Sequence, residues 1–217
     1  MVSAPATRSR TALPTSGTQR IVTGTDPGVL AQAAHGGAEL AVWRRATRPE
    51  FDAWLDALAR ERLPRCHAEV VAGNAESLVL SACREVGLEA EGPAAVLAAD
   101  MAELARRFCR LSGLTTVDLR VEPIDHDACR FFHRDRVALR MVATYRGPGT
   151  QIVPGERADE ALRLQGEYDG PLEHLQRGSI ALFQGSARGD TGVVHRSPPM
   201  AGLAGTRLLL CLSVPFR

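Results

Sequence analysis

Lysine is absent from the 217-residue sequence, so arginine supplies all 26 of its permanently cationic side chains. Without lysine the chain cannot form a Schiff base with a carbonyl substrate, and it lacks the cation of a phosphate-binding P-loop. Arginine stays protonated and presents a flat fork of N–H donors. We therefore expect any bound carboxylate or phosphate to be held by an arginine.

The net charge is also small, and the sequence lacks closely spaced cysteine pairs and long apolar runs. The formal net charge is +1, which favours a small neutral or acidic ligand over a nucleic acid or an anionic membrane as partner. The five cysteines are scattered without a Cys-x-x-Cys pair, a pattern typical of a reducing compartment. The sequence shows no membrane-spanning run and no apolar block of a signal peptide. We expect a cytoplasmic protein with no membrane partner.

The chain divides into a short tail and one domain. Residues 1–20 are rich in Ser, Thr, Pro, Ala and Arg and are predicted to form a mobile tail. Residues 21–217 are predicted to form a single domain, since 45% of the sequence is apolar. Its first part, residues 21–113, is expected to be mainly helical. Apolar residues recur there at helical spacing within 48–63, 74–87 and 93–111.

The second part, residues 114–217, is expected to carry the strands and the site. The segment TTVDLRVEPI alternates apolar and charged residues, and VALRMVATY, GSIALFQG, TGVVHRS and TRLLLCLSV follow it. These short strands predict an α+β chain whose helices pack outside a cupin-like β-sandwich or barrel. The long connection from Gly147 to Arg177 is expected to cover a site, with a helical turn in ADEALRLQ.

His133 and Asp135 are two residues apart in FHRDR, and His195 lies on a later predicted strand, GVVHRSPP. On a strand, residues i and i+2 point to the same face about 6.5–7 Å apart, so both side chains can reach one ion. Two imidazoles and one carboxylate form the facial triad of non-haem Fe(II) sites, which leaves positions open for other ligands. The alternative is a surface His and Asp that form a local hydrogen bond.

The last predicted strand suggests a cation inside the barrel. Leu208, Leu210 and Leu212 share one apolar face of TRLLLCLSV, which places Arg207 on the opposite, inward face. An inward arginine requires an anion, which a bound carboxylate can supply. The alternative places Arg207 at the start of the strand, in solvent. Arg140 is a second candidate of the same kind.

Two further residues have alternative roles. Tyr145 precedes a Gly-Pro-Gly turn, where it can donate a hydrogen bond to a ligand or close the core. Cys129, four residues before His133, can complete the coordination if the metal is zinc, which binds Cys and His. Its alternative is a small buried apolar residue.

The blocks FHRDRVALRMVATYRGPGT, GSIALFQG, VHRSPP and GTRLLLCLSV resemble, in order and spacing, the bacterial family catalogued as domain of unknown function 1826. The resemblance covers roughly residues 115–214 and is looser in the helical part. It implies a small cytoplasmic protein whose partner could be a zinc-linked metallochaperone GTPase, and it brings no established activity. The matching positions are His133, Asp135, Arg140, Tyr145, Gly147, Gly149, His195 and Arg207.

The His-x-Asp pair, the later histidine and the Gly-x-Arg strand are more distantly similar to 2-oxoglutarate-dependent Fe(II) dioxygenases. This similarity implies a C-terminal double-stranded β-helix (cupin or jelly-roll-like) with N-terminal helices packed on it. It also implies Fe(II) and 2-oxoglutarate as cofactors, with Arg207 at the far carboxylate of 2-oxoglutarate. The sequence departs from the pattern of these dioxygenases in two ways. The spacing from His195 to Arg207 is slightly longer, and Leu209 stands at a position that often carries serine.

Two functions follow from these patterns. In the first, the protein is a dioxygenase that acts on an unidentified small molecule or protein. Its Fe(II) is held by His133, Asp135 and His195. Its co-substrate is bound by Arg207, Arg140 and Tyr145. In the second, the protein is a non-catalytic zinc- or iron-binding protein linked to metal homeostasis, and Cys129 closes the coordination sphere.

Overall fold

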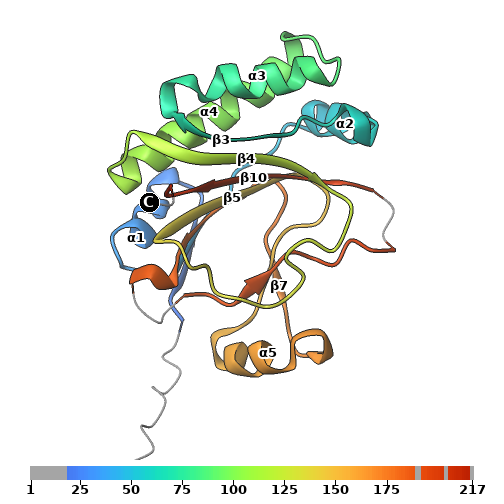
Figure 1. The fold of residues 1–217 in the computed structure, drawn as a ribbon. Helices are drawn as coiled ribbons and strands as arrows, with labels where there is room; N and C mark the ends of the chain where they lie inside the picture. Colours follow the sequence, from blue (N-terminus) through green and yellow to red (C-terminus); the bar gives the residue numbers. More distant parts are fainter. Residues whose placement is uncertain (1–18, 189–191, 203–204, 216–217) are drawn as a thin grey trace, which may run out of the picture.

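The computed structural model describes residues 19–188, 192–202 and 205–215, so nearly all of the predicted tail lies outside the described residues. Strands and helices alternate irregularly along the chain (Figure 1). The strands are β1 Ile21–Gly24, β2 Leu40–Trp43, β3 Cys66–Val71, β4 Thr116–Ile124, β5 Leu139–Arg146, β6 Gln151–Ile152, β7 Glu173–His174, β8 Ile180–Gln184, β9 His195–Arg196 and β10 Arg207–Ser213. The α-helices are α1 Ala31–Ala34, α2 Pro49–Ala57, α3 Ala75–Glu85, α4 Gly92–Ser112 and α5 Ala158–Leu164.

Two sheets of unequal size form the centre of the molecule. The large sheet has seven strands in the order β1-β2-β8-β5-β10-β4-β3, and the small sheet has three in the order β7-β6-β9. All pairs in the large sheet are antiparallel except β1 with β2, so this sheet is mixed. The small sheet lies below the large one in the view of Figure 1.

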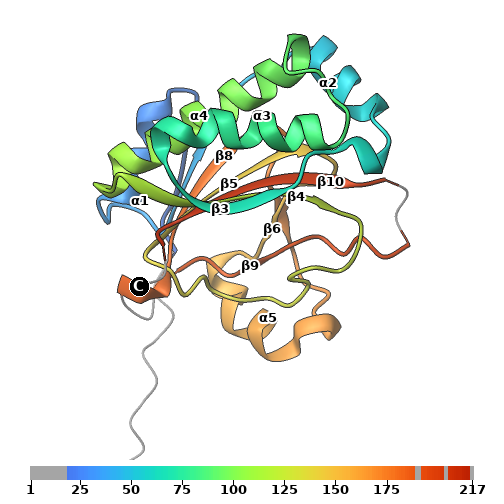
Figure 2. The same ribbon diagram turned by 45° about the horizontal axis from the view of Figure 1, so that its top comes forward.

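Three helices cover one face of the large sheet, with α3 beside α4 and α2 toward one end of the sheet (Figure 1 and Figure 2). The longest helix, α4, begins beside Pro93 and ends at Gly113, whose φ of 74° suits a residue without a Cβ. Leu208, Leu210 and Leu212 of β10 pack into the core below these helices, as the alternation predicts. The three helices predicted within 48–63, 74–87 and 93–111 are confirmed.

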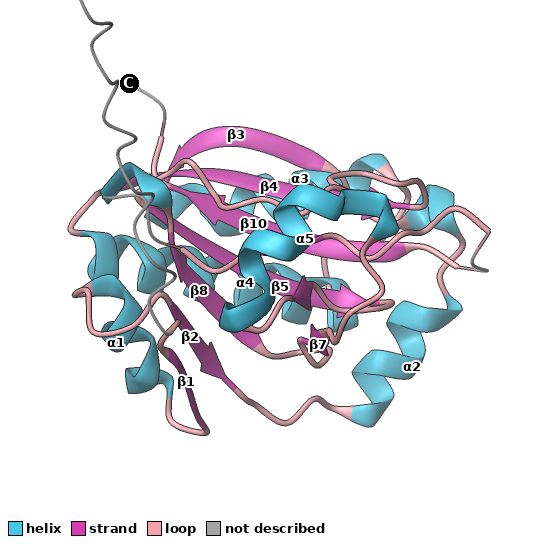
Figure 3. Ribbon diagram, turned by 90° about the horizontal axis from the view of Figure 1, so that it is seen from below, coloured by secondary structure: helices cyan, strands magenta, loops and turns pink. Residues whose placement is uncertain are grey.

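The opposite face of the large sheet packs against the small sheet. The core between the two sheets is apolar and includes Val142, Ile152, Phe183 and Leu209. Beyond the small sheet lies α5, which is nearest the viewer in Figure 3. This helix forms within ADEALRLQ, as predicted, so the long connection between β5 and β8 is structured and supplies a layer of the fold.

The first part of the chain contributes more strand than expected. Residues 21–113, predicted to be mainly helical, supply β1, β2 and β3 to the large sheet. The sheet therefore spans the expected boundary at residue 113, and both parts of the chain build one core. None of the described helices is long and apolar enough to cross a membrane.

Candidate metal centre

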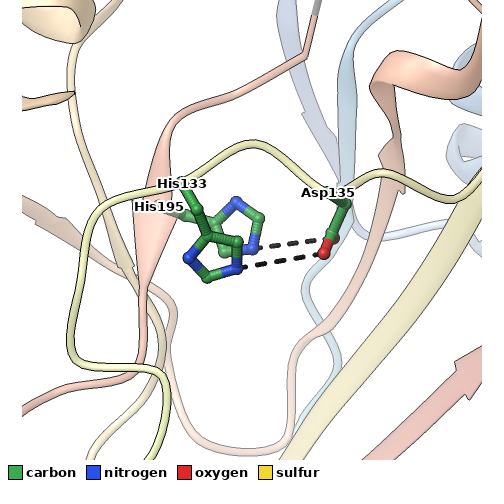
Figure 4. Close-up of side chains that lie close together, drawn as sticks. All are labelled: His133, Asp135 and His195. Atoms are coloured by element: carbon green, nitrogen blue, oxygen red, sulfur yellow. Dashed lines mark ion pairs between the residues drawn. The ribbon is translucent and has the colours of Figure 1, made fainter.

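His133, Asp135 and His195 converge in the structure (Figure 4). One ligand atom from each residue lies within 4.8 Å of the other two. The distances to the carboxylate are 3.9 Å from His133 Nε2 to Oδ1 and 3.6 Å from His195 Nε2 to Oδ2. Asp135 and His195 are buried, whereas His133 is partly exposed. The predicted convergence is confirmed, and one side of the cluster faces solvent.

The local backbone differs from the prediction, because His133 and Asp135 do not lie on a regular strand. They lie in an irregular segment before β5, where His133 forms an isolated bridge with His195, the first residue of β9. The two residues exchange backbone N–H···O=C hydrogen bonds of 3.0 Å in both directions. The carbonyl of Asp135 accepts from the backbone N–H of Ser186 at 2.7 Å. These bonds, rather than strand periodicity, align the three side chains.

Both imidazoles are oriented by backbone carbonyls. Nδ1 of His133 donates to the carbonyl of Phe131 at 2.9 Å, and Nδ1 of His195 donates to that of Val193 at 3.0 Å. The proton is therefore on Nδ1 in each ring, and the lone pair of Nε2 faces Asp135. Burial lowers the pKa of His195 to about 4, so this imidazole is neutral at neutral pH.

The arrangement fits a cation. Oδ2 of Asp135 is buried and has no hydrogen-bond partner. The carboxylate of Asp135 and the Nε2 atoms of the two imidazoles thus face one another, an arrangement that a positive ion in this space would stabilise. Two neutral imidazoles and one carboxylate are the donors that divalent iron accepts.

Arg140 contacts the cluster directly. Its Nη1 donates to Oδ1 of Asp135 at 2.5 Å, and its Nε donates to the hydroxyl of Ser213 at 3.2 Å. One carboxylate oxygen is therefore fixed by Arg140, which leaves Oδ2 for an ion. The ring of Phe183 lies 4.5 Å from that of His195 and packs against it. Arg140 thus orients a ligand residue, a role different from the predicted co-substrate contact.

Arg207 is fully buried, as the inward orientation predicts. Its Nη1 donates to Ser197 Oγ at 3.0 Å, and its Nη2 donates to Thr144 Oγ1 at 3.0 Å and Thr150 Oγ1 at 2.8 Å. Its Nε has no hydrogen-bond partner. Burial lowers the pKa of Arg207 to about 10, so it remains charged at neutral pH. None of the described carboxylates forms an ion pair with it.

Thr150 reaches Arg207 through the tight turn after β5. Gly147 has a φ of 78°, and a Cβ at this position would lie 3.0 Å from Cα of Arg207. A Cβ on Gly149 would lie 1.7 Å from the carbonyl oxygen of Leu175, so no other residue fits there. The glycines of this turn therefore let the backbone pass close to β10 and to residue 175.

Arg207 and Arg140, which contacts Asp135 of the candidate metal centre, lie on the same face of the large sheet. Thr144 and Arg140 lie on the same side of β5, roughly 13 Å apart along the strand, and Val142 lies between them. Ser197, which contacts Arg207, follows His195 by two residues. A buried cation and a set of metal ligands are thus placed at two ends of one inward surface.

Tyr145 lies on the other face of β5, so the expectation that it binds a cofactor beside the metal is wrong. Successive strand residues point to opposite faces, and Tyr145 differs from Thr144 by one position. Its side chain packs in the core below the helices, and its hydroxyl donates to Oδ2 of Asp100 at 2.5 Å. The structure favours the alternative, in which Tyr145 closes the core.

Tyr145→Phe is expected to lower the free energy of unfolding by about 1 kcal/mol. The substitution removes the hydrogen bond from the Tyr145 hydroxyl to the carboxylate of Asp100, which still has Arg45 as a partner. Denaturant titration measures this change. Fe(II) affinity is expected to equal that of the unaltered protein, since the residue faces away from His133. A clear loss of Fe(II) affinity would place Tyr145 in the metal centre after all.

Cys129 does not join the cluster. It is exposed and has a φ of 46°, a left-handed conformation in an irregular segment. The metal-ligand group found among the described residues contains His133, Asp135 and His195 alone. A closed four-ligand zinc site with Cys129 is therefore not formed, and the arrangement is an open one.

Comparisons with known proteins agree with the resemblance seen in the sequence. The model of the family described as "Protein of unknown function (DUF1826)" matches residues 24–213. Comparison with curated proteins gives no match.

Several solved structures are similar at low identity. Dioxygenase for auxin oxidation 1 from Arabidopsis thaliana, in a complex with 2-oxoglutarate, has 11% identity and a TM-score of 0.44, and the alignment covers 90% of this chain and 91% of that chain. Neurospora crassa T7H in complex with alpha-KG has 9% identity and a TM-score of 0.40, with 89% and 82% covered. A Pseudomonas putida prolyl-4-hydroxylase has 16% identity and a TM-score of 0.33, with 79% and 97% covered.

Proposed function

The chain belongs to the family described as proteins of unknown function (DUF1826), and we propose that it is an Fe(II)- and 2-oxoglutarate-dependent oxygenase. One observation carries this proposal. An open set of two imidazoles and a carboxylate shares an inward surface with a buried arginine that lacks an anionic partner among the described residues. The first feature suits Fe(II) with free coordination positions, and the second suits the carboxylate of a co-substrate.

The residues have separate tasks in this proposal. His133, Asp135 and His195 would hold the iron, which when bound supplies the chemistry that activates O₂. Arg140 keeps Asp135 oriented through its hydrogen bond to Oδ1. Arg207 would bind the far carboxylate of 2-oxoglutarate and so fix the orientation of its 2-oxo acid end toward the iron.

Three hydroxyl groups complete the co-substrate site. Thr144, Thr150 and Ser197 already surround the guanidinium of Arg207 and can also donate hydrogen bonds to a carboxylate. Leu209 stands at the position, two residues after Arg207, where dioxygenases of this type often carry a serine. In this chain the hydroxyls of Thr144, Thr150 and Ser197 would supply the hydrogen bond that the serine would make. We propose that the large and small sheets are the two halves of a double-stranded β-helix around this site.

The non-catalytic alternative is less favoured. A structural zinc site normally has four protein ligands, and Cys129, the residue proposed as the fourth, is exposed and outside the cluster. The buried cation of Arg207 also has no role in a protein that only binds a metal. A dicarboxylate co-substrate would account for both the open cluster of three ligand residues and the buried charge of Arg207.

Anaerobic addition of Fe(II) and 2-oxoglutarate is expected to produce a weak visible absorption band, because the 2-oxo acid group coordinates the iron beside the three ligands. Spectrophotometric titration measures it. Succinate, which has both carboxylates but no 2-oxo group, is the matched control and should give no band. If saturating Fe(II) and 2-oxoglutarate together give the same featureless spectrum as succinate, the proposed co-substrate is wrong.

A further inference from the structure

A second pocket lies on the helical side of the large sheet, away from the metal centre. It encloses about 460 Å³ between α2, α4 and the segments that precede α2 and β8. Tyr145 lines it, and this side chain points away from the face that carries Arg140 and Thr144. The sheet therefore separates this pocket from the proposed iron site.

The wall of the pocket includes a rigid polar network. Arg45 donates to both carboxylate oxygens of Asp100, at 2.6 and 2.7 Å, and Tyr145 donates to the same carboxylate. Nε of Arg45 donates to the carbonyl of Gly178 at 2.8 Å. A Cβ on Gly178 would lie 2.3 Å from Cγ2 of Thr47, so the two wall segments are in close contact. This network is satisfied within the protein and needs no ligand to neutralise it.

One cation remains without a partner at the pocket. Arg177 forms ion pairs with Asp52 at 3.3 Å and with Asp56 at 2.7 Å. Arg48 also lines the pocket, and its exposed side chain forms no hydrogen bond or ion pair with a described residue. The pocket lining contains three arginines and two aspartates, a net charge of +1, and the guanidinium of Arg48 is free to meet a ligand.

The rest of the lining offers apolar surface. Phe51 packs at 5.6 Å from the ring of Trp54 and presents an aromatic side chain to the pocket. Val96 is 40% exposed, and Ala99 lies beside it on α4. Val96 is one of three large apolar residues that are exposed among the described residues. Val96 therefore offers exposed apolar surface to a ligand in the pocket.

We propose that this pocket binds a small organic monocarboxylate with an apolar body about the size of an aromatic ring. Its volume lies within the usual range of small-molecule sites, roughly 300–1,000 Å³. Its wall combines apolar side chains with five charged ones, four of which are paired within the protein. Arg48 meets the carboxylate, while Phe51 and Val96 contact the apolar body. This site does not depend on iron or on 2-oxoglutarate.

Calorimetric titration with 3-phenylpropanoate tests the proposal on the full chain. We expect saturable binding that Arg48→Gln weakens about tenfold, because a charge-assisted hydrogen bond is lost. The neutral analogue 3-phenylpropanol should bind about tenfold more weakly to the unaltered protein, for the same reason. Val96→Trp should abolish binding, because the larger side chain fills the pocket.

Arg163→Gln is the matched control, since Arg163 is an exposed arginine on α5, on the far side of the molecule. It should leave binding unchanged, and saturating 2-oxoglutarate with Fe(II) should not displace the acid. The proposal is overturned if 3-phenylpropanoate shows no saturable binding. It is also overturned if Arg48→Gln and Val96→Trp bind as the unaltered protein does, or if 2-oxoglutarate competes.

Discussion

Replacing His195 with alanine is expected to lower the affinity for Fe(II) by at least about 100-fold, because loss of a second-shell residue alone typically costs 10–100-fold. His195 contributes one of the three ligand atoms, and its ring is held by the carbonyl of Val193 and by Phe183. The substitution leaves one imidazole and one carboxylate, which are too few to hold the ion at micromolar concentration. An anaerobic competition titration against a coloured chelator measures the affinity.

His67→Ala provides the matched control for this substitution. His67 lies on β3, an edge strand of the large sheet, and forms a hydrogen bond of 3.0 Å with Asp118. This variant should keep the Fe(II) affinity of the unaltered protein. Circular dichroism of both variants without metal checks that each is folded. Equal Fe(II) affinity in folded His195→Ala and in the unaltered protein would remove His195 from the metal centre.

Arg207→Leu is expected to raise the dissociation constant of 2-oxoglutarate by about 100-fold or more, because the co-substrate loses a buried charged partner worth roughly 3–5 kcal/mol. The hydroxyls of Thr144, Thr150 and Ser197 remain but carry no charge. Fe(II) affinity should be unchanged, since Arg207 does not contact the three ligands. Titration of the visible band with 2-oxoglutarate at saturating Fe(II) gives the constant.

A 2-oxo acid without a second carboxylate separates the effect on binding from an effect on folding. 2-Oxobutyrate can coordinate iron through the same 2-oxo acid group but cannot reach Arg207 with an anion. It should bind weakly to the unaltered protein and with similar strength to Arg207→Leu. If the variant still prefers 2-oxoglutarate over 2-oxobutyrate as strongly as the unaltered protein does, the far carboxylate is bound elsewhere.

The cluster of His133, Asp135 and His195 could be predicted from the sequence because few residue types bind metal ions and the chain contains only six histidines. The strand expected at His133 and Asp135 was not needed, since a single bridge to His195 aligns them. The inward orientation of Arg207 followed from the apolar alternation of β10, which fixes both faces once one of them is known to be in the core.

The hydroxyls around Arg207 could not be predicted in the same way. Thr144, Thr150 and Ser197 come from β5, from a turn and from the segment after β9, and only tertiary packing brings them together. Hydroxyl side chains are common, so their positions in the sequence carry little information. In contrast, the sequence could have predicted that Tyr145 and Arg140 lie on opposite faces of β5. The two residues are separated by an odd number of strand positions.

The strands of the first part were missed because they are short and lack a distinctive pattern. β2 is a run of four apolar or aromatic residues in the interior of the sheet, and periodicity alone does not distinguish such a run from a buried helical turn. β3 alternates apolar Cys66, Ala68 and Val70 with polar His67 and Glu69, so its pattern was present in the sequence but extends over only five residues. Pairing with strands distant in the sequence is what fixes both segments.

The reciprocal backbone bond between His133 and His195 has a consequence for how the fold holds together. It joins the segment before β5 to the first residue of β9 in the small sheet, and an ion bound here would link the same two segments through their side chains as well. Opening of the small sheet and release of the ion then become one event. If the site holds Fe(II) as proposed, binding of the ion would therefore stabilise this half of the molecule to an extent that rises with the free iron concentration.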